Sequence, residues 1–124
     1  MTKAFVSVDM EGIAGIAHLR QVTRGAEDFP MARELMTLEA NAAVAGAFDG
    51  GATAVVVNDS HGDMYNLIAE LMDPRAEVLI GSPKSLSMVQ GFTGETCVDI
   101  AVPCTFFEYR LRPYHCFAIA PSVR

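Results

Sequence analysis

The run Thr53-Ala54-Val55-Val56-Val57 decides the fold class, because it is continuously apolar and rich in β-branched residues. Such a run is typical of a strand that is buried on both faces of a parallel sheet. Upstream, Ala4-Phe5-Val6-Ser7-Val8 is also short and rich in β-branched residues, and it predicts a first buried strand that ends at Asp9. The sequence between the two runs is long enough for the crossover helix that parallel strands need.

A helix is predicted over Met31 to Phe48, between Pro30 and Gly50-Gly51. Proline suits the first turn of a helix, and paired glycines are a strong stop signal. Apolar side chains that recur every three or four residues predict one buried stripe on this helix. They are Leu35, Leu38, Ala42, Ala45 and Phe48. Strand, helix and strand together form a right-handed βαβ unit.

The rest of the chain continues this alternation. Glu77 to Ile80 predicts a third strand, and Val98 to Val102 predicts a fourth. A short helix is expected over Met64 to Met72 with Asp63 as its cap, and a helical turn over Lys84 to Gln90. We therefore predict an α/β fold with a mostly parallel sheet and flanking helices, arranged in three layers.

Composition narrows the function classes. The chain has 124 residues and a formal net charge of −6, which suits one small domain and argues against nucleic acid and anionic membranes as partners. No apolar run is long enough for a membrane span, and we expect no signal peptide. Three cysteines without a CxxC pair favour a reducing, cytoplasmic location. The apolar fraction of 51% favours a subunit interface, and hence a homo-oligomer.

Polar clusters follow the first two strands. Asp9 and Glu11 end the first strand, and as residues i and i+2 they are expected on the same face. Two adjacent carboxylates repel each other unless a cation lies between them. His61 follows the second strand, and parallel strands end at one shared edge of the sheet. Carboxylate and imidazole ligands together suit a catalytic divalent metal such as zinc.

Alternatives remain open for these clusters. Asp9 and Glu11 also suit a solvated turn, and His61 also suits a capping or surface position. One residue of Asn58-Asp59-Ser60 is a candidate partner that orients His61. His18, in a polar loop from about His18 to Pro30, is a weaker candidate for the same cleft.

Four segments match a known family: Ser7-Val8-Asp9-Met10-Glu11-Gly12-Ile13-Ala14-Gly15, Glu39-Ala40-Asn41, Val57-Asn58-Asp59-Ser60-His61-Gly62 and Ser87-Met88-Val89-Gln90-Gly91. In order and spacing, across residues 3 to 92, they resemble the zinc-dependent D-aminopeptidases of the dipeptide-transport-protein type. The resemblance implies two zinc ions per subunit and cleavage of N-terminal D-residues from short peptides that contain D-amino acids. It also implies assembly into a ring-like decamer.

By the same resemblance, Asp9 bridges both zinc ions, and Glu11 and His61 complete the first site. After Val102 the match fails. The family has a Gly-Tyr-His-Ala motif whose histidine binds the second zinc, whereas this chain has Pro103-Cys104-Thr105-Phe106-Phe107. His115 falls near the family's catalytic histidine by count, in different surroundings, and is our candidate for that catalytic role.

We therefore expect residues 1–102 to be the N-terminal part of an incomplete family domain, with one complete zinc site at most. Residues 103–124 are expected to be an atypical tail, truncated or frame-shifted. The expected function is a D-aminopeptidase-like metallohydrolase whose activity is in question, because ligands of the second metal are missing. The alternative is a degenerate, non-catalytic fragment that binds a metal or a partner.

Overall fold

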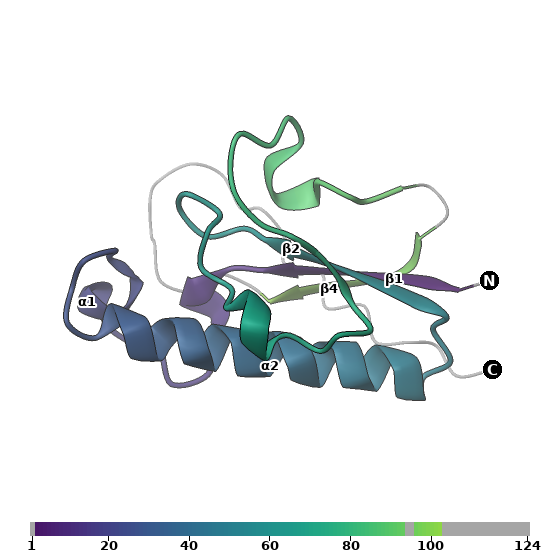
Figure 1. The fold of residues 1–124 in the computed structure, drawn as a ribbon, viewed down its shortest axis with the longest axis horizontal. Coiled ribbons are helices and arrows are strands. Elements are labelled where there is room, and N and C mark those ends of the chain that lie inside the picture. The colour runs from purple at the N-terminus through teal and green to yellow at the C-terminus, as the bar shows by residue number, and fades with distance from the viewer. Residues whose placement is uncertain (1, 94–95, 103–124) are drawn as a thin grey trace.

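The computed structural model describes residues 2–93 and 96–102 and contains a four-stranded parallel sheet. The strands lie in the order β3-β2-β1-β4 and all end on the left in Figure 1. They are β1 (Lys3–Val8), β2 (Ala54–Asp59), β3 (Glu77–Leu79) and β4 (Thr96–Val102). The predicted α/β fold with a parallel sheet is confirmed.

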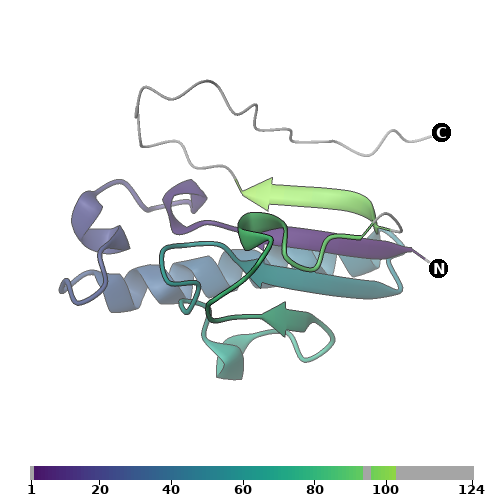
Figure 2. The same cartoon turned by 90° about the horizontal axis from the view of Figure 1, so that it is seen from above.

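One long helix, α2 (Phe29–Asp49), connects β1 to β2 and covers one face of the sheet (Figures 1 and 2). A short helix, α1 (Leu19–Val22), precedes it within the segment predicted as a polar loop. The other face carries the segment around the 3-10 turn η3 (Ser87–Val89), where the rings of Phe92 and Phe5 meet edge to face at 5.9 Å. The sheet is therefore sandwiched between α2 and this segment.

The main core lies between α2 and the sheet. Alternate residues of β1 face it, namely Ala4, Val6 and Val8, and each is at most 1% exposed. Phe5 and Ser7, which lie between them in the sequence, face the layer that contains η3. This alternation follows from the pleat of the strand, and it explains why both faces of β1 are covered.

The buried stripe predicted for α2 is wrong in part. Leu38 is 59% exposed and Ala42 is also exposed, while Leu35 and Phe48 pack only at the margin of the core. The fully buried apolar side chains toward the sheet are Ala32, Met36, Ala40 and Val44. These recur every fourth residue, along one side of the helix. Ala32 and Ala40 are small, and they let the helix approach the sheet closely. The position of a residue around the helix axis, rather than the size of its side chain, therefore decides whether it is buried.

The short helix predicted over Met64 to Met72 is not formed, and only the 3-10 turn η2 (Ala69–Leu71) lies there. The backbone N–H groups of Asn66 and Leu67 donate instead to the buried Asp59 carboxylate, at 2.6 and 2.8 Å. Met64 has a φ of 59°, outside the right-handed helical region. Hydrogen bonds to a buried charge are stronger than those between neutral groups, and here they replace the helical pattern.

The other predicted elements agree with the structure. Helix α2 begins two residues before the predicted start, and Gly51, with a φ of 94°, follows its end. The helical turn expected over Lys84 to Gln90 is η3, and the fourth predicted strand lies within β4. In the described part of the chain, no helix combines the length and apolarity needed to cross a bilayer.

Candidate metal centre

Asp9, Glu11 and His61 meet at the edge of the sheet where β1 and β2 end. The two strands are hydrogen-bonded neighbours with Val8 opposite Asp59, so the segments that leave them start side by side. Nδ1 of His61 lies 3.1 Å from Oδ1 of Asp9 and 2.8 Å from Oε2 of Glu11. The structure thus brings together the three side chains that the sequence singled out.

Glu11 reaches this site by a different route from the one predicted. Strand β1 ends at Val8, and Glu11 lies in the 3-10 turn η1 (Met10–Gly12) rather than on the strand. The turn is closed by the N–H of Gly12, which donates to the Asp9 carbonyl at 3.1 Å. Met10 is fully buried and anchors the turn in the core. A tight turn brings residues i and i+2 close together, so the two carboxylates still converge.

The His61 ring is held from its other side by α1. Its Nε2 atom lies 2.9 Å from the carbonyl oxygen of Val22. A carbonyl oxygen only accepts, so Nε2 carries a hydrogen and donates it. Nδ1 is therefore the atom that faces the two carboxylates. Histidine ligands commonly donate their second ring N–H in this way, which fixes the ring for metal binding. Val22 has no sequence signal, because every residue has a carbonyl group.

Without a metal, a proton on His61 balances the two carboxylates. Burial alone would lower the pKa of His61, but hydrogen bonds with Asp9 and Glu11 outweigh it and raise that pKa to about 10. Burial would likewise raise the pKa of Glu11, yet hydrogen bonds with His61 and Asp9 lower it to about 2. The pKa of Asp9 is raised, chiefly by burial. The site therefore favours one positive charge between its acids.

The three side chains also fit a divalent metal. One ligand atom from each lies within 4.8 Å of the others. Two ligands of one zinc ion are about 3.3 Å apart when zinc–ligand distances are about 2.0–2.2 Å, close to the spacing of Nδ1 and the carboxylate oxygens. The side chains of Asp9, Glu11 and His61 are 16%, 14% and 11% exposed. Across residues 2–93 and 96–102, they form the one cluster of three such ligands that could hold an ion.

The remaining histidines do not join this cluster. His18 is exposed and caps α1, with Nδ1 accepting the N–H of Arg20 at 3.1 Å. His18, the weaker candidate for the cleft, is thus a capping residue of α1 in the structure. His115 lies outside the described residues, as does the segment 103–107 that replaces the second-zinc motif. The catalytic role of His115, the loss of second-metal ligands and the character of the tail 103–124 stay predictions.

The other motif residues hold the segments around the site in place. Glu39 on α2 accepts the N–H of Ala14 at 2.9 Å, which fixes the loop after η1. Asn58 donates from Nδ2 to the Met88 carbonyl at 3.0 Å, and the Ser7 hydroxyl donates to the same carbonyl at 2.7 Å. The first, third and fourth matching segments are therefore joined directly across the ends of β1 and β2.

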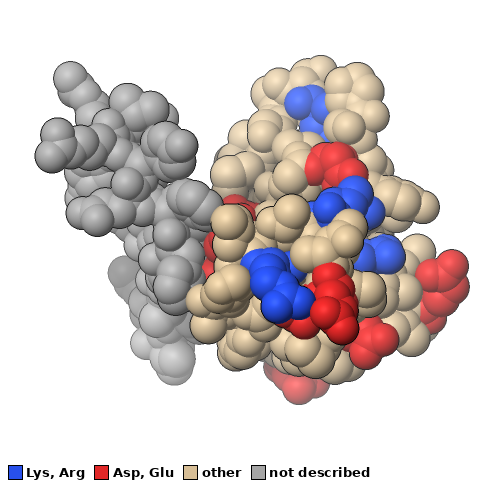
Figure 3. All heavy atoms as spheres, turned by 90° about the vertical axis from the view of Figure 1, so that its left-hand side faces the viewer, with Lys and Arg blue, Asp and Glu red and all other residues tan. Residues whose placement is uncertain are grey.

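Charge on this side of the molecule is mixed. Figure 3 looks at the side on which the strands end, and it shows Lys and Arg interspersed with Asp and Glu over the described surface. A face for nucleic acid would instead gather basic side chains into one patch.

Comparison with known proteins identifies relatives of the chain. A family model described as D-aminopeptidase matches residues 2–102. A curated D-aminopeptidase of Bacillus subtilis (strain 168) is 45% identical over 121 residues. That alignment covers 98% of this chain and so extends past residue 102, but this chain spans only 40% of the relative.

A solved structure has the same fold. It is described as the Zn-dependent D-aminopeptidase DppA from Bacillus subtilis, a self-compartmentalizing protease. The superposition has a TM-score of 0.79 at 40% sequence identity, and it covers 81% of this chain and 36% of the other. The likeness therefore covers most of this chain but only about a third of the longer protein.

Proposed function

This chain belongs to the D-aminopeptidase family, and on that premise we propose that it carries part of a zinc-dependent hydrolase site. The substrates we propose are short peptides with an N-terminal D-residue. We assign Asp9, Glu11 and His61 as zinc ligands. The observation that carries the proposal is the convergence of Nδ1 of His61 with both carboxylates, at 2.8 and 3.1 Å.

Each ligand has a distinct part in this proposal. Asp9 and Glu11 supply two negative charges in a largely buried place, which favours a dication over a proton. His61 supplies a neutral nitrogen, aimed by the hydrogen bond from Nε2 to the Val22 carbonyl. A bound zinc ion supplies Lewis acidity toward a peptide carbonyl and lowers the pKa of water. The family relationship supports the choice of zinc among divalent metals.

The wider setting is proposed from the relatives. The DppA structure is described as self-compartmentalizing, so we propose that this chain assembles with copies of itself. We also propose a cytoplasmic location, as expected from the cysteine pattern. This chain spans 40% of its curated relative, so we propose the hydrolytic activity of the whole enzyme separately from membership of the family.

Zinc content and hydrolysis, measured together, test the proposal. We expect the dialysed 124-residue chain to retain zinc, and His61→Ala to lose it. His18→Ala is the matched control and should keep zinc, because His18 only caps α1. Hydrolysis of D-Ala-D-Ala but not of L-Ala-L-Ala, dependent on zinc, would support the enzyme. A chain that binds no zinc, or binds it equally well after His61→Ala, would contradict the ligand assignment.

A second candidate function is a non-catalytic metal-binding module. It is favoured by the presence of one ligand cluster, rather than two, among the residues that the structure describes. Stoichiometric zinc that is lost on His61→Ala, without hydrolysis of D-Ala-D-Ala by the same preparation, would favour this candidate over the enzyme.

A further inference from the structure

The last residue of β2, Asp59, carries a buried carboxylate that is separate from the proposed metal ligands. Asp59 is fully buried, and its two oxygens accept four N–H groups. Oδ2 accepts the backbone N–H groups of Asn66 and Leu67, at 2.6 and 2.8 Å. Oδ1 accepts Nδ2 of Asn66 at 2.9 Å and the backbone N–H of His61 at 3.3 Å. A buried charge is tolerated only when it is well hydrogen-bonded, as here.

Asn66 completes a clamp around His61. The Nδ2 group that donates to Asp59 also donates to the His61 carbonyl, at 2.6 Å. The backbone of His61 is therefore held at its N–H by Asp59 and at its carbonyl by Asn66. Asn66 is only 1% exposed. These buried polar groups fix the peptide planes before and after His61. They thereby fix the direction of the Cα–Cβ bond of His61.

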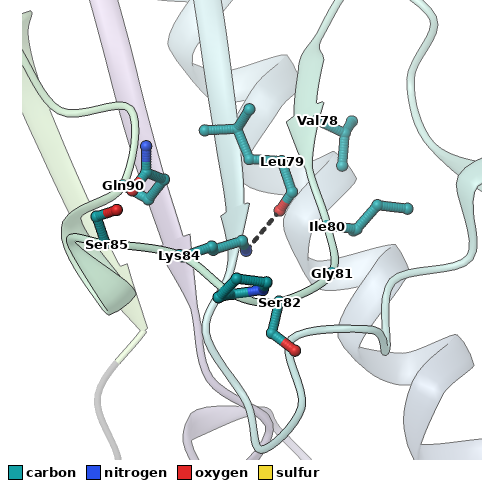
Figure 4. Close-up of a pocket in the computed structure, with 9 residues that line it drawn as sticks. Val78, Leu79, Ile80, Gly81, Ser82, Lys84, Ser85 and Gln90 are labelled. Atoms are coloured by element: carbon teal, nitrogen blue, oxygen red, sulfur yellow. Dashed lines mark hydrogen bonds between the residues drawn. The ribbon is translucent and has the colours of Figure 1, made fainter.

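The clamp is anchored to elements outside the loop. Nζ of Lys84 donates to the Asp59 carbonyl at 2.6 Å and also to the Leu79 carbonyl, as Figure 4 shows for Leu79. Arg24 donates to Oδ1 of Asn66 at 3.0 Å, and Arg33 donates to its carbonyl at 2.7 Å. Arg24 lies two residues after Val22, which holds the His61 ring. The same stretch of chain thus steadies the backbone of the ligand and its ring.

We propose that Asp59 and Asn66 are a positioning pair that sets the place of His61 and thereby the affinity of the metal site. The inference rests on the proposed role of His61 as a zinc ligand. Neither residue belongs to the ligand cluster of Asp9, Glu11 and His61. Their effect passes through the backbone of His61, and the loss of such supporting hydrogen bonds typically weakens metal binding about 10- to 100-fold.

Two substitutions separate position from charge. In Asp59→Asn the new NH₂ group must face N–H donors whichever way the amide turns, because both carboxylate oxygens only accept. In Asn66→Ala the Asp59 charge stays, and only the side-chain clamp is lost. We expect both variants of the full chain to bind zinc about 10- to 100-fold more weakly in competition with a chelator. The visible absorption of bound Co²⁺ should also change, because it reports ligand geometry.

Asn41→Ala is the matched control. Asn41 also holds the β2–β3 connection by side-chain hydrogen bonds, accepting the N–H of Asp73 and donating to the Leu71 carbonyl, both at 2.7 Å. The Asn41→Ala substitution should lower the thermal stability of the chain and leave its zinc affinity unchanged. Circular dichroism at the temperature of the binding assay shows which variants are folded, and Asn66→Ala decides the matter if Asp59→Asn does not fold.

The outcomes are distinct. Weaker zinc binding by folded Asn66→Ala, with the control unchanged, supports the positioning pair. Unchanged binding by Asn66→Ala, or equal weakening by Asn41→Ala, overturns it and leaves the metal assignment standing. No zinc binding by the parent chain overturns the metal assignment and this inference together.

Discussion

A single imidazole connects three parts of the chain at the residue scale. His61 reaches Asp9 and Glu11 through Nδ1 and the Val22 carbonyl through Nε2, and its backbone is held by the loop that follows β2. In the metal-free protein a proton on Nδ1 therefore supplies the positive charge between the two carboxylates that a bound metal ion would supply. Metal and proton compete for one nitrogen atom.

That competition predicts proton release. The folded-state pKa of His61 is about 10, so at pH 8 the metal-free ring is protonated, whereas a zinc-bound ring is neutral at Nδ1. Zinc binding at pH 8 should release about one proton, against only a few hundredths for a histidine with an ordinary pKa of about 6.5. Titration calorimetry in buffers of different ionisation enthalpy measures this number. Binding without proton release at pH 8 would show that Nδ1 is not the ligand atom.

The site could be predicted from residue patterns only in part. Asp9 and His61 each follow an apolar run, and neighbouring parallel strands end at one edge of the sheet. The sequence alone therefore predicts that Asp9 and His61 lie close together. The Val22 carbonyl and the Asn66 side chain act through long-range hydrogen bonds that no local pattern marks. Asp59 was one of three candidates beside His61, and only the structure identifies it as the one whose side chain accepts the backbone N–H of His61.

At the scale of elements, strands were easier to predict than helix faces. The runs at 4–8 and 53–57 are mostly apolar and rich in valine, and both form central strands of the sheet, so their assignment leaves little freedom. Helix α2 carries alanine or leucine on several sides, so periodicity alone does not select the one that faces the sheet. The segment 64–72 resembles a helix by composition, and the Asp59 carboxylate overrides that local preference.

The corrected face of α2 predicts unequal effects for two similar truncations. Met36 is fully buried against the sheet, and Leu38, two residues later, is 59% exposed. Met36→Ala should lower the free energy of unfolding by about 2–5 kcal/mol. Leu38→Ala is the control and should change it by no more than about 0.5 kcal/mol. Urea unfolding of the metal-free proteins measures both, and equal losses would restore the stripe that the sequence suggested.

At the scale of the whole molecule, the proposed metal site joins the two central strands. Asp9 and Glu11 follow the end of β1, and His61 follows the end of β2. An ion bound to all three residues would therefore link the two strands of the βαβ unit. A ligand that binds only the folded state stabilises the entire domain, in proportion to the logarithm of its concentration above Kd.

Zinc should therefore raise the thermal stability of the chain. At a free zinc concentration 100-fold above Kd, the free energy of unfolding should rise by about 2.7 kcal/mol, which raises Tm by roughly 10 °C for a domain of this size. Scanning calorimetry in chelator-buffered zinc measures the shift, and excess chelator should reverse it. The His61→Ala protein should show no shift. A Tm of the parent chain that does not change with zinc would contradict a site formed in the folded state.

The sheet order β3-β2-β1-β4 has a consequence for how the chain acquires this structure during synthesis. The first strand made, β1, is interior, and its second edge has no partner until Thr96–Val102 has been translated. The proposed metal ligands, the Val22 carbonyl and the Asp59–Asn66 pair all lie between residues 9 and 66. A growing chain emerges N-terminal end first. The residues of the proposed site are therefore made before β4, while one edge of β1 still has no partner strand. We therefore expect the supply of zinc to affect the order of folding as well as the stability of the folded protein.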